Sequence, residues 1–117
     1  MFTVVKEQGP NVIVEAEGMI HSSDYDVLTP TLEGVVKEHG HANLMIIAEG
    51  LKGETPRAMT KDAEFGFGVY KDVKKFALVS DETWLRVAVH MMSPFTGTEE
   101  KVFGLDERAD AEAWLTA

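Results

Sequence analysis

The chain has 117 residues, 44% of them hydrophobic and 26% charged, which is typical of one globular domain covering residues 1–117. It has no cysteine, so disulfides, thiolate metal centres and a cysteine nucleophile are excluded. Its 11 basic and 20 acidic residues give a net charge of -9, which argues against binding to nucleic acid or to an anionic membrane. The N-terminal residues lack a basic segment followed by a long apolar stretch. We therefore expect no signal peptide, no transmembrane segment and a cytoplasmic location.

Two β-rich segments open the chain, at residues 2–6 and 11–17. The Gly-Pro-Asn sequence at 9–11 between them is a turn signal and predicts a hairpin. Glu15 and Glu17 share one side of the second segment, as an acid–base pair would. Neighbouring like charges on a strand are more typical of a face that meets water.

The first predicted helix follows the Ser-Ser-Asp sequence at 22–24, which is a good N-cap signal, and ends at Gly40. Pro30 removes one backbone hydrogen bond from this helix, so we expect a kink or a restart there. Residues 44–48 are continuously apolar, a pattern typical of a strand buried on both faces of a parallel sheet.

Three further helices alternate with two short apolar strands, at residues 76–79 and 101–103. Such alternation needs crossover connections, so the sequence predicts an α/β fold with a mostly parallel sheet. The N-cap signals of these helices are, in order, Thr55 before Pro56, Ser80 or Asp81, and Asp106. Each helix carries an apolar stripe, for which core packing is the first interpretation. The stripes are Met59, Ala63, Phe67 and Tyr70; Trp84, Val87, Ala88 and Met91; and Ala109, Ala113 and Trp114.

Short motifs spread over nearly the whole chain point to one family. They include Gly18-Met19-Ile20, Leu28-Thr29-Pro30-Thr31-Leu32, Glu38-His39-Gly40, Gly50-Leu51-Lys52-Gly53 and Ala111-Glu112-Ala113-Trp114-Leu115. On these motifs the chain resembles the SpoIIAA-like group of STAS/SEC14-type domains. The resemblance implies an α/β fold (α+β by some schemes) whose mixed sheet has four or five strands and helices mainly on one face. It also implies a protein that binds rather than catalyses.

The regulatory STAS proteins carry an Asp-Ser/Thr-x-Gly motif at the start of the helix after the central strand, where phosphorylation switches partner binding. The matching region here reads Leu51-Lys52-Gly53-Glu54-Thr55-Pro56-Arg57, without the Asp and the Gly. Thr55 is the nearest hydroxyl and is the candidate phosphorylation site, although its ordinary role is to cap a helix. Lys52, Thr55 and Arg57 could also bind an anion, because a helix start presents free N–H groups.

Methionine and aromatic residues concentrate in the second and third predicted helices and in the loop after them. They could form plain core, line a pocket for an apolar ligand, or make a contact surface. Phe95 follows Pro94 in the loop and is the one least explained by core packing. The Gly-Phe-Gly sequence at 66–68 lacks the later glycine of a dinucleotide site. The set is Met59, Phe65, Phe67, Tyr70, Trp84, Met91, Met92 and Phe95.

The histidines do not show metal-ligand spacing, since no two of them, and no Glu-x-x-His pair, share one helical face. We expect structural or surface roles for them, no metal and no cofactor; they are His21, His39, His41 and His90. A hydrolase or isomerase that uses His21, Asp24 or Glu54 would need a cavity in which at least two of these converge.

Three functions follow from these observations. The first is a non-enzymatic STAS-like regulatory module that contacts a protein partner or a second copy of itself as a homodimer. The second is a SEC14-like carrier or sensor that encloses a lipid or another apolar small molecule. The last is the small hydrolase or isomerase, for which no nucleophile elbow is present.

Overall fold

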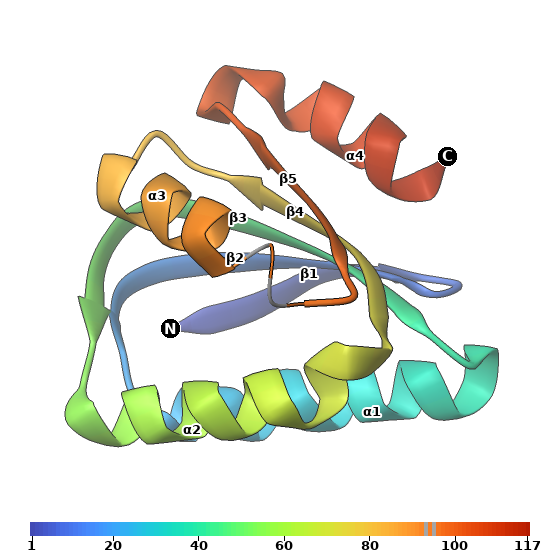
Figure 1. Cartoon of the computed structure of the whole chain (residues 1–117), viewed down its shortest axis with the longest axis horizontal. Helices are drawn as coiled ribbons and strands as arrows, with labels where there is room; N and C mark the ends of the chain where they lie inside the picture. The colour runs from blue at the N-terminus through green and yellow to red at the C-terminus, as the bar shows by residue number, and fades with distance from the viewer. Residues whose placement is uncertain (93, 95) are drawn as a thin grey trace.

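The structure, a computed structural model, describes residues 1–92, 94 and 96–117, with the backbone alone at Met92. Five strands form one mixed sheet whose spatial order is the chain order (Figure 1). The first two strands pair antiparallel through the predicted hairpin, and the remaining pairs are all parallel. The α/β class and the mixed sheet are thus confirmed. The strands are β1 (Phe2–Gln8), β2 (Asn11–Ile20), β3 (Ala42–Glu54), β4 (Val73–Val79) and β5 (Glu99–Phe103).

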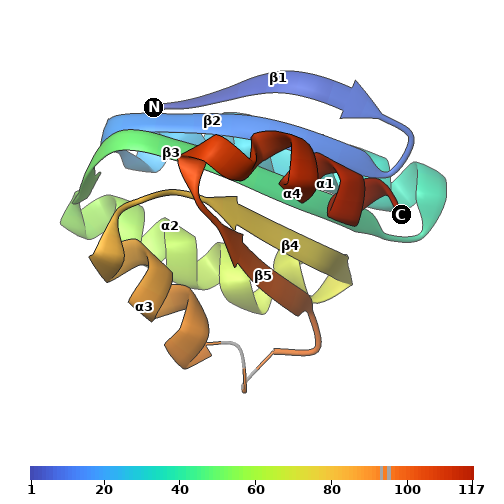
Figure 2. The same ribbon diagram turned by 90° about the horizontal axis from the view of Figure 1, so that it is seen from above.

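Three helices connect the successive parallel strands, and each connection moves one strand further across the sheet in the same direction. Because crossovers between parallel strands are almost always right-handed, these helices are placed on the same side of the sheet. The fourth helix follows the last strand and covers the opposite face (Figures 1 and 2). Helices mainly on one face were expected, and this is confirmed. The helices are α1 (Tyr25–His39), α2 (Pro56–Phe67), α3 (Thr83–Met92) and α4 (Arg108–Thr116).

Alternation along the strands divides the apolar side chains between two cores. Val12 and Val14 of β2 lie with Leu28 and Leu32 of α1 in the first core, and Ile13 between them lies in the second. The second core is closed by α4, which contributes Ala111 and Leu115. A strand buried on both faces can be apolar at every position, which explains residues 44–48.

The central strand β3 is much longer than residues 44–48 predict, because its pairing with β2 continues to Glu54. The extra segment bends at Gly50 (φ 71°) and Gly53 (φ 139°), and the register with β2 shifts twice alongside it. Both backbone conformations favour glycine. The extension carries Glu54 to the start of α1, since Glu54 pairs with Ile20 at the end of β2.

The restart expected at Pro30 is wrong, because α1 continues as one helix from Tyr25 to His39. Pro30 is exposed in the second turn, where its missing N–H removes only one hydrogen bond, to the Asp26 carbonyl. A single 3-10 turn at Ser22–Asp24 precedes the helix. Gly40 ends α1 as predicted, with φ 81° and its N–H donating to the Val36 carbonyl at 2.7 Å.

The predicted core side of α2 is wrong. The helix buries Ala58 and Phe65, while Met59 and Phe67 are exposed. Tyr70 lies beyond the end of α2 in the 3-10 turn Val69–Asp72. The side of α2 that faces the sheet therefore consists largely of one small residue and one aromatic ring. A prediction based on the spacing of large apolar residues does not identify this side.

The same error of helix phase occurs in α4, where Ala111 and Leu115 are buried while Ala109 and Ala113 are exposed. Its N-terminus also differs from the prediction. A 3-10 turn at Leu105–Glu107 comes first, and the Glu107 carboxylate accepts the Gly104 N–H at 2.7 Å. Asp106 therefore lies one turn ahead of α4 instead of capping it.

Candidate functional site

Thr55 forms the helix cap that the sequence predicts. Its Oγ1 accepts the Ala58 N–H at 3.1 Å, and Pro56 follows at the first helical position. The Thr55 N–H donates to the Ile20 carbonyl at 2.9 Å, which ties this helix start to the end of β2. Lys52 and Arg57 are exposed on either side. Phosphorylation of Thr55 and anion binding by these residues remain predictions.

A cluster of polar side chains that the sequence does not predict includes Glu54, the residue directly before this cap. Tyr25, at the start of α1, is buried and donates its hydroxyl to Glu54 Oε1 at 2.5 Å. Asp62 of α2 adds a second carboxyl group whose charge acts on Glu54. The cluster therefore joins α1, the end of β3 and α2.

Withdrawal from water sets the protonation of this cluster. Burial raises the pKa of Glu54, the nearby Asp62 charge raises it further, and the Tyr25 hydrogen bond lowers it in part. Asp62 is exposed as a residue, yet its carboxyl group rests against the other two, and this burial raises its pKa as well. Burial and the Glu54 carboxylate raise the Tyr25 pKa, so the phenol remains a hydrogen-bond donor.

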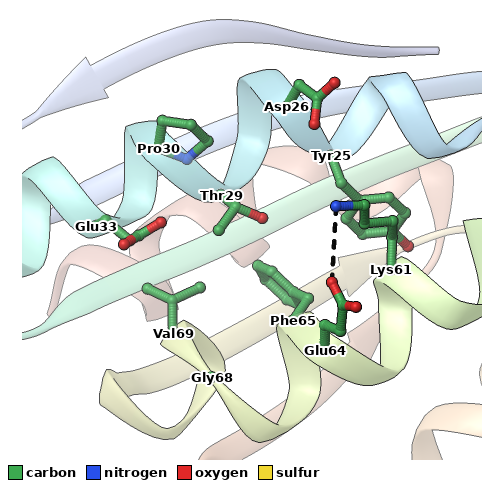
Figure 3. A pocket seen from close by; sticks show the side chains of 10 residues that line it. All are labelled: Tyr25, Asp26, Thr29, Pro30, Glu33, Lys61, Glu64, Phe65, Gly68 and Val69. Atoms are coloured by element: carbon green, nitrogen blue, oxygen red, sulfur yellow. Dashed lines mark ion pairs between the residues drawn. The ribbon is translucent and has the colours of Figure 1, made fainter.

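A groove of about 350 Å³ runs between α1 and α2 on the outer side of these helices (Figure 3). Its floor is apolar and consists of Tyr25, Phe65 and Val69, all buried. Its rim is charged, with Asp26 and Glu33 from α1 and with Lys61 and Glu64 from α2. The Lys61 ammonium lies 3.7 Å from the Glu64 carboxylate, so this cation is already paired.

A second groove, of about 320 Å³, lies on the other face of the sheet beside α4. Ile13, Met45 and Ile47 line it, and an ion pair of 2.9 Å between Lys6 and Glu112 lies at its side. Glu15 also lines this groove and is exposed, as is Glu17, so the solvated face predicted for this side of β2 is confirmed.

The α3 outer face, which we define as Trp84, Val87, Ala88 and Met91, is turned away from the core. Trp84 and Val87 are each 48% exposed and Met91 is 68% exposed. The opposite side of the helix, with Leu85 and Val89, is half-buried against the first core. Core packing of the Trp84 stripe is therefore wrong. Figure 2 shows α3 toward the edge of the sheet that β4 and β5 form, away from α4.

The other residues of the methionine and aromatic set have separate places. Met59 and Phe67 are exposed on α2, and Phe65 is in the first core. Tyr70 is half-buried and donates its hydroxyl to Glu100. Phe95 and the side chain of Met92 lie outside the described residues.

The side chains required for the hydrolase or isomerase do not meet in either groove. His21 Nδ1 and Asp24 Oδ2 are 4.0 Å apart, but Glu54 turns to Tyr25, and none of the three lines the grooves described above. Within residues 1–92, 94 and 96–117, no three acidic or histidine side chains are placed to hold a metal ion. None of the helices in that part of the chain has both the length and the apolar character needed to cross a bilayer.

A mixed, mostly parallel sheet with three crossover helices on one face and a closing helix on the other is typical of an α/β domain of STAS type. The SpoIIAA-like family model matches residues 12–116, and the chain belongs to the SpoIIAA-like family. A similar solved structure is that of an uncharacterized protein of the DUF3478 family with a SpoIIAA-like fold from Shewanella loihica PV-4. The two are 25% identical with a TM-score of 0.77, over 98% of this chain and 92% of that one. No curated protein matches the chain significantly.

Proposed function

We propose that the chain is a non-enzymatic regulatory domain of the cytoplasm that acts through protein contacts, and that the α3 outer face is its contact surface. The exposure of Trp84, Val87 and Met91 on one side of one helix carries this proposal. An apolar helix face that is exposed in the isolated chain is typical of an interaction site. A helix that is apolar on both sides is normally covered on both sides.

The size of these side chains fits a contact that holds a partner. Complete burial of a Val or Met side chain contributes roughly 1.5–3 kcal/mol, before the cost of association is subtracted. Tryptophan is among the residues that most often dominate binding energy in protein interfaces, and methionine adapts to irregular surfaces. Either another protein or a second copy of this chain could supply the complementary surface.

Regulation by phosphorylation is not part of this proposal. Thr55 is used as a helix cap, and the residues around it differ from the Asp-Ser/Thr-x-Gly motif. The SEC14-like carrier would need an enclosed volume between α2 and α3. The two grooves described above lie between α1 and α2 and beside α4, so neither of them favours the carrier.

Site-specific photo-crosslinking tests the contact. A photoreactive amino acid replaces Met91 in the chain expressed in its source cells, and a matched variant carries it at Asp110, which is exposed on α4. We expect a defined crosslinked protein species from position 91 only, which is lost when Trp84→Glu is added. Equal crosslinking at both positions, or none at position 91, would contradict the proposal. The mass of the species distinguishes a homodimer from another partner.

A further inference from the structure

The groove between α1 and α2 is separate from the α3 outer face, and the proposed function does not depend on it. It combines an apolar floor with an acidic rim (Figure 3). We propose that this groove binds a basic amphipathic helix of a partner protein. The apolar side of that helix would cover Phe65 and Val69, and its Lys or Arg side chains would meet the rim.

The shape of the groove supports a helical occupant. The helices α1 and α2 run side by side and in the same direction, with Phe65 and Val69 between them (Figure 3). A channel between two helices with an apolar floor accepts the apolar side of a third helix. Its volume of about 350 Å³ has room for one or two large side chains.

The negative charge of the groove favours a positively charged occupant. Asp26, Glu33 and Glu64 contribute three carboxylates, against the one ammonium of Lys61. That ammonium is 3.7 Å from Glu64, so Asp26 and Glu33 are the carboxylates that a partner's cations would meet first. Both are exposed on α1. Asp26 directly follows Tyr25, and Glu33 lies about two helical turns further along.

The whole chain reinforces this local preference. Its net charge of -9 attracts basic partners and repels acidic ones over the distance of the ionic atmosphere. Complementary charge of this kind raises association rates and rejects partners of the wrong sign. An apolar floor alone would accept an acidic amphipathic helix equally well, so the rim determines specificity.

A selection experiment with unbiased peptides tests the proposal. A phage-displayed library of helical peptides is selected on the full chain, with the Asp26→Lys/Glu33→Lys double variant used for counter-selection. We expect the enriched peptides to carry Lys or Arg beside an apolar side. Their affinity should fall at least about tenfold on the double variant, as expected when close charge pairs are lost.

A matched control reverses two charges elsewhere. Glu7 on β1 and Glu38 at the end of α1 are exposed and do not line the groove. Glu7→Lys/Glu38→Lys makes the same change in net charge and should alter affinity less than about threefold. Thermal unfolding of each variant shows whether it is folded, and the milder Asp26→Asn/Glu33→Gln variant should give an intermediate loss.

The proposal would be overturned by enriched peptides that are acidic or neutral, by equal losses on the two double variants, or by displacement of the peptides by spermidine alone. The last would assign the groove to a small polyamine. Peptides whose binding is lost with Trp84→Glu and kept with the groove variants would also overturn it, while supporting the α3 outer face as the contact surface. Failure of the crosslink at position 91 would leave this groove test unaffected.

Discussion

A phenol and two carboxyl groups influence one another where α1, β3 and α2 meet. Tyr25 donates to Glu54 at 2.5 Å, and Asp62 lies beside both. Close carboxyl groups titrate as a pair, because the first negative charge opposes the second. The raised pKa of Glu54 and Asp62 means that the folded chain holds a proton more tightly than the unfolded chain does. This part of the stability is present at low pH and is lost as the pH rises through the raised pKa.

Asp62→Asn should therefore stabilise the chain near neutral pH. The amide keeps the shape of the carboxyl group and removes the charge that opposes ionisation of Glu54. We expect the thermal midpoint at pH 7.5 to rise by a few degrees, and the gain to shrink as the pH falls toward 4, the ordinary pKa of an aspartate. Thermal unfolding from pH 4 to pH 8 measures both.

Asp110→Asn is the control, since Asp110 is exposed in the first turn of α4. It should change the midpoint little and without this slope against pH. A gain from Asp62→Asn that is the same at pH 4 and pH 7.5, or a loss at pH 7.5, would contradict the pairing of the two carboxyl groups.

The sequence predicts the cap at Thr55 but not the cluster next to it. Thr-Pro is a local signal, because the cap and its N–H donor are three residues apart. The approach of Glu54 to Tyr25 depends on the extension of β3 through Gly50 and Gly53. Pairing with β2 determines that extension. Because the extension consists mostly of polar residues and glycine, the sequence alone does not predict it as a strand.

Helix α3 shows why periodicity gives the helix but not its orientation. The sequence correctly predicts a helix that carries Trp84 and Met91 on one side. Leu85 and Val89 form a second apolar side, and the structure turns this smaller pair toward the core. A helix with two apolar sides has no unique inward face until the sheet is in place. Met59 and Phe67 of α2 are exposed for the same reason, since the sheet determines which side of that helix is buried.

Substitutions on the two sides of α3 test this orientation. Leu85→Ala should lower the free energy of unfolding by about 1–2 kcal/mol, below the cost of truncating a fully buried leucine. Val87→Ala, on the exposed side, should change it by less than about 0.5 kcal/mol. Urea unfolding of dilute protein measures both variants. If Val87→Ala cost as much as Leu85→Ala, the inward side of α3 would be the opposite one.

The topology of the whole chain follows closely from the sequence. Alternating strands and helices predict parallel pairing, and the Gly-Pro-Asn turn predicts the antiparallel pair of β1 and β2. Right-handed crossovers in one direction then place α1, α2 and α3 together. The two proposed interaction surfaces are not predictable to the same degree, because each depends on which side of a helix meets the sheet. The stripe at Trp84 was found from the sequence, and the α1/α2 groove was not.

The protection of Met91 from oxidation tests the central claim most directly. The purified chain, diluted below the concentration at which it self-associates, and an extract of its source cells are treated briefly with dilute hydrogen peroxide, and peptide mass spectrometry follows each methionine. In the purified chain, exposed Met91 should oxidise quickly and buried Met45 slowly. Met19 of β2, which is exposed outside the α3 outer face, serves as the reference for peroxide dose. If a protein covers the α3 outer face, Met91 oxidises several-fold more slowly in the extract, relative to Met19. Equal relative rates in the two samples would contradict the claim.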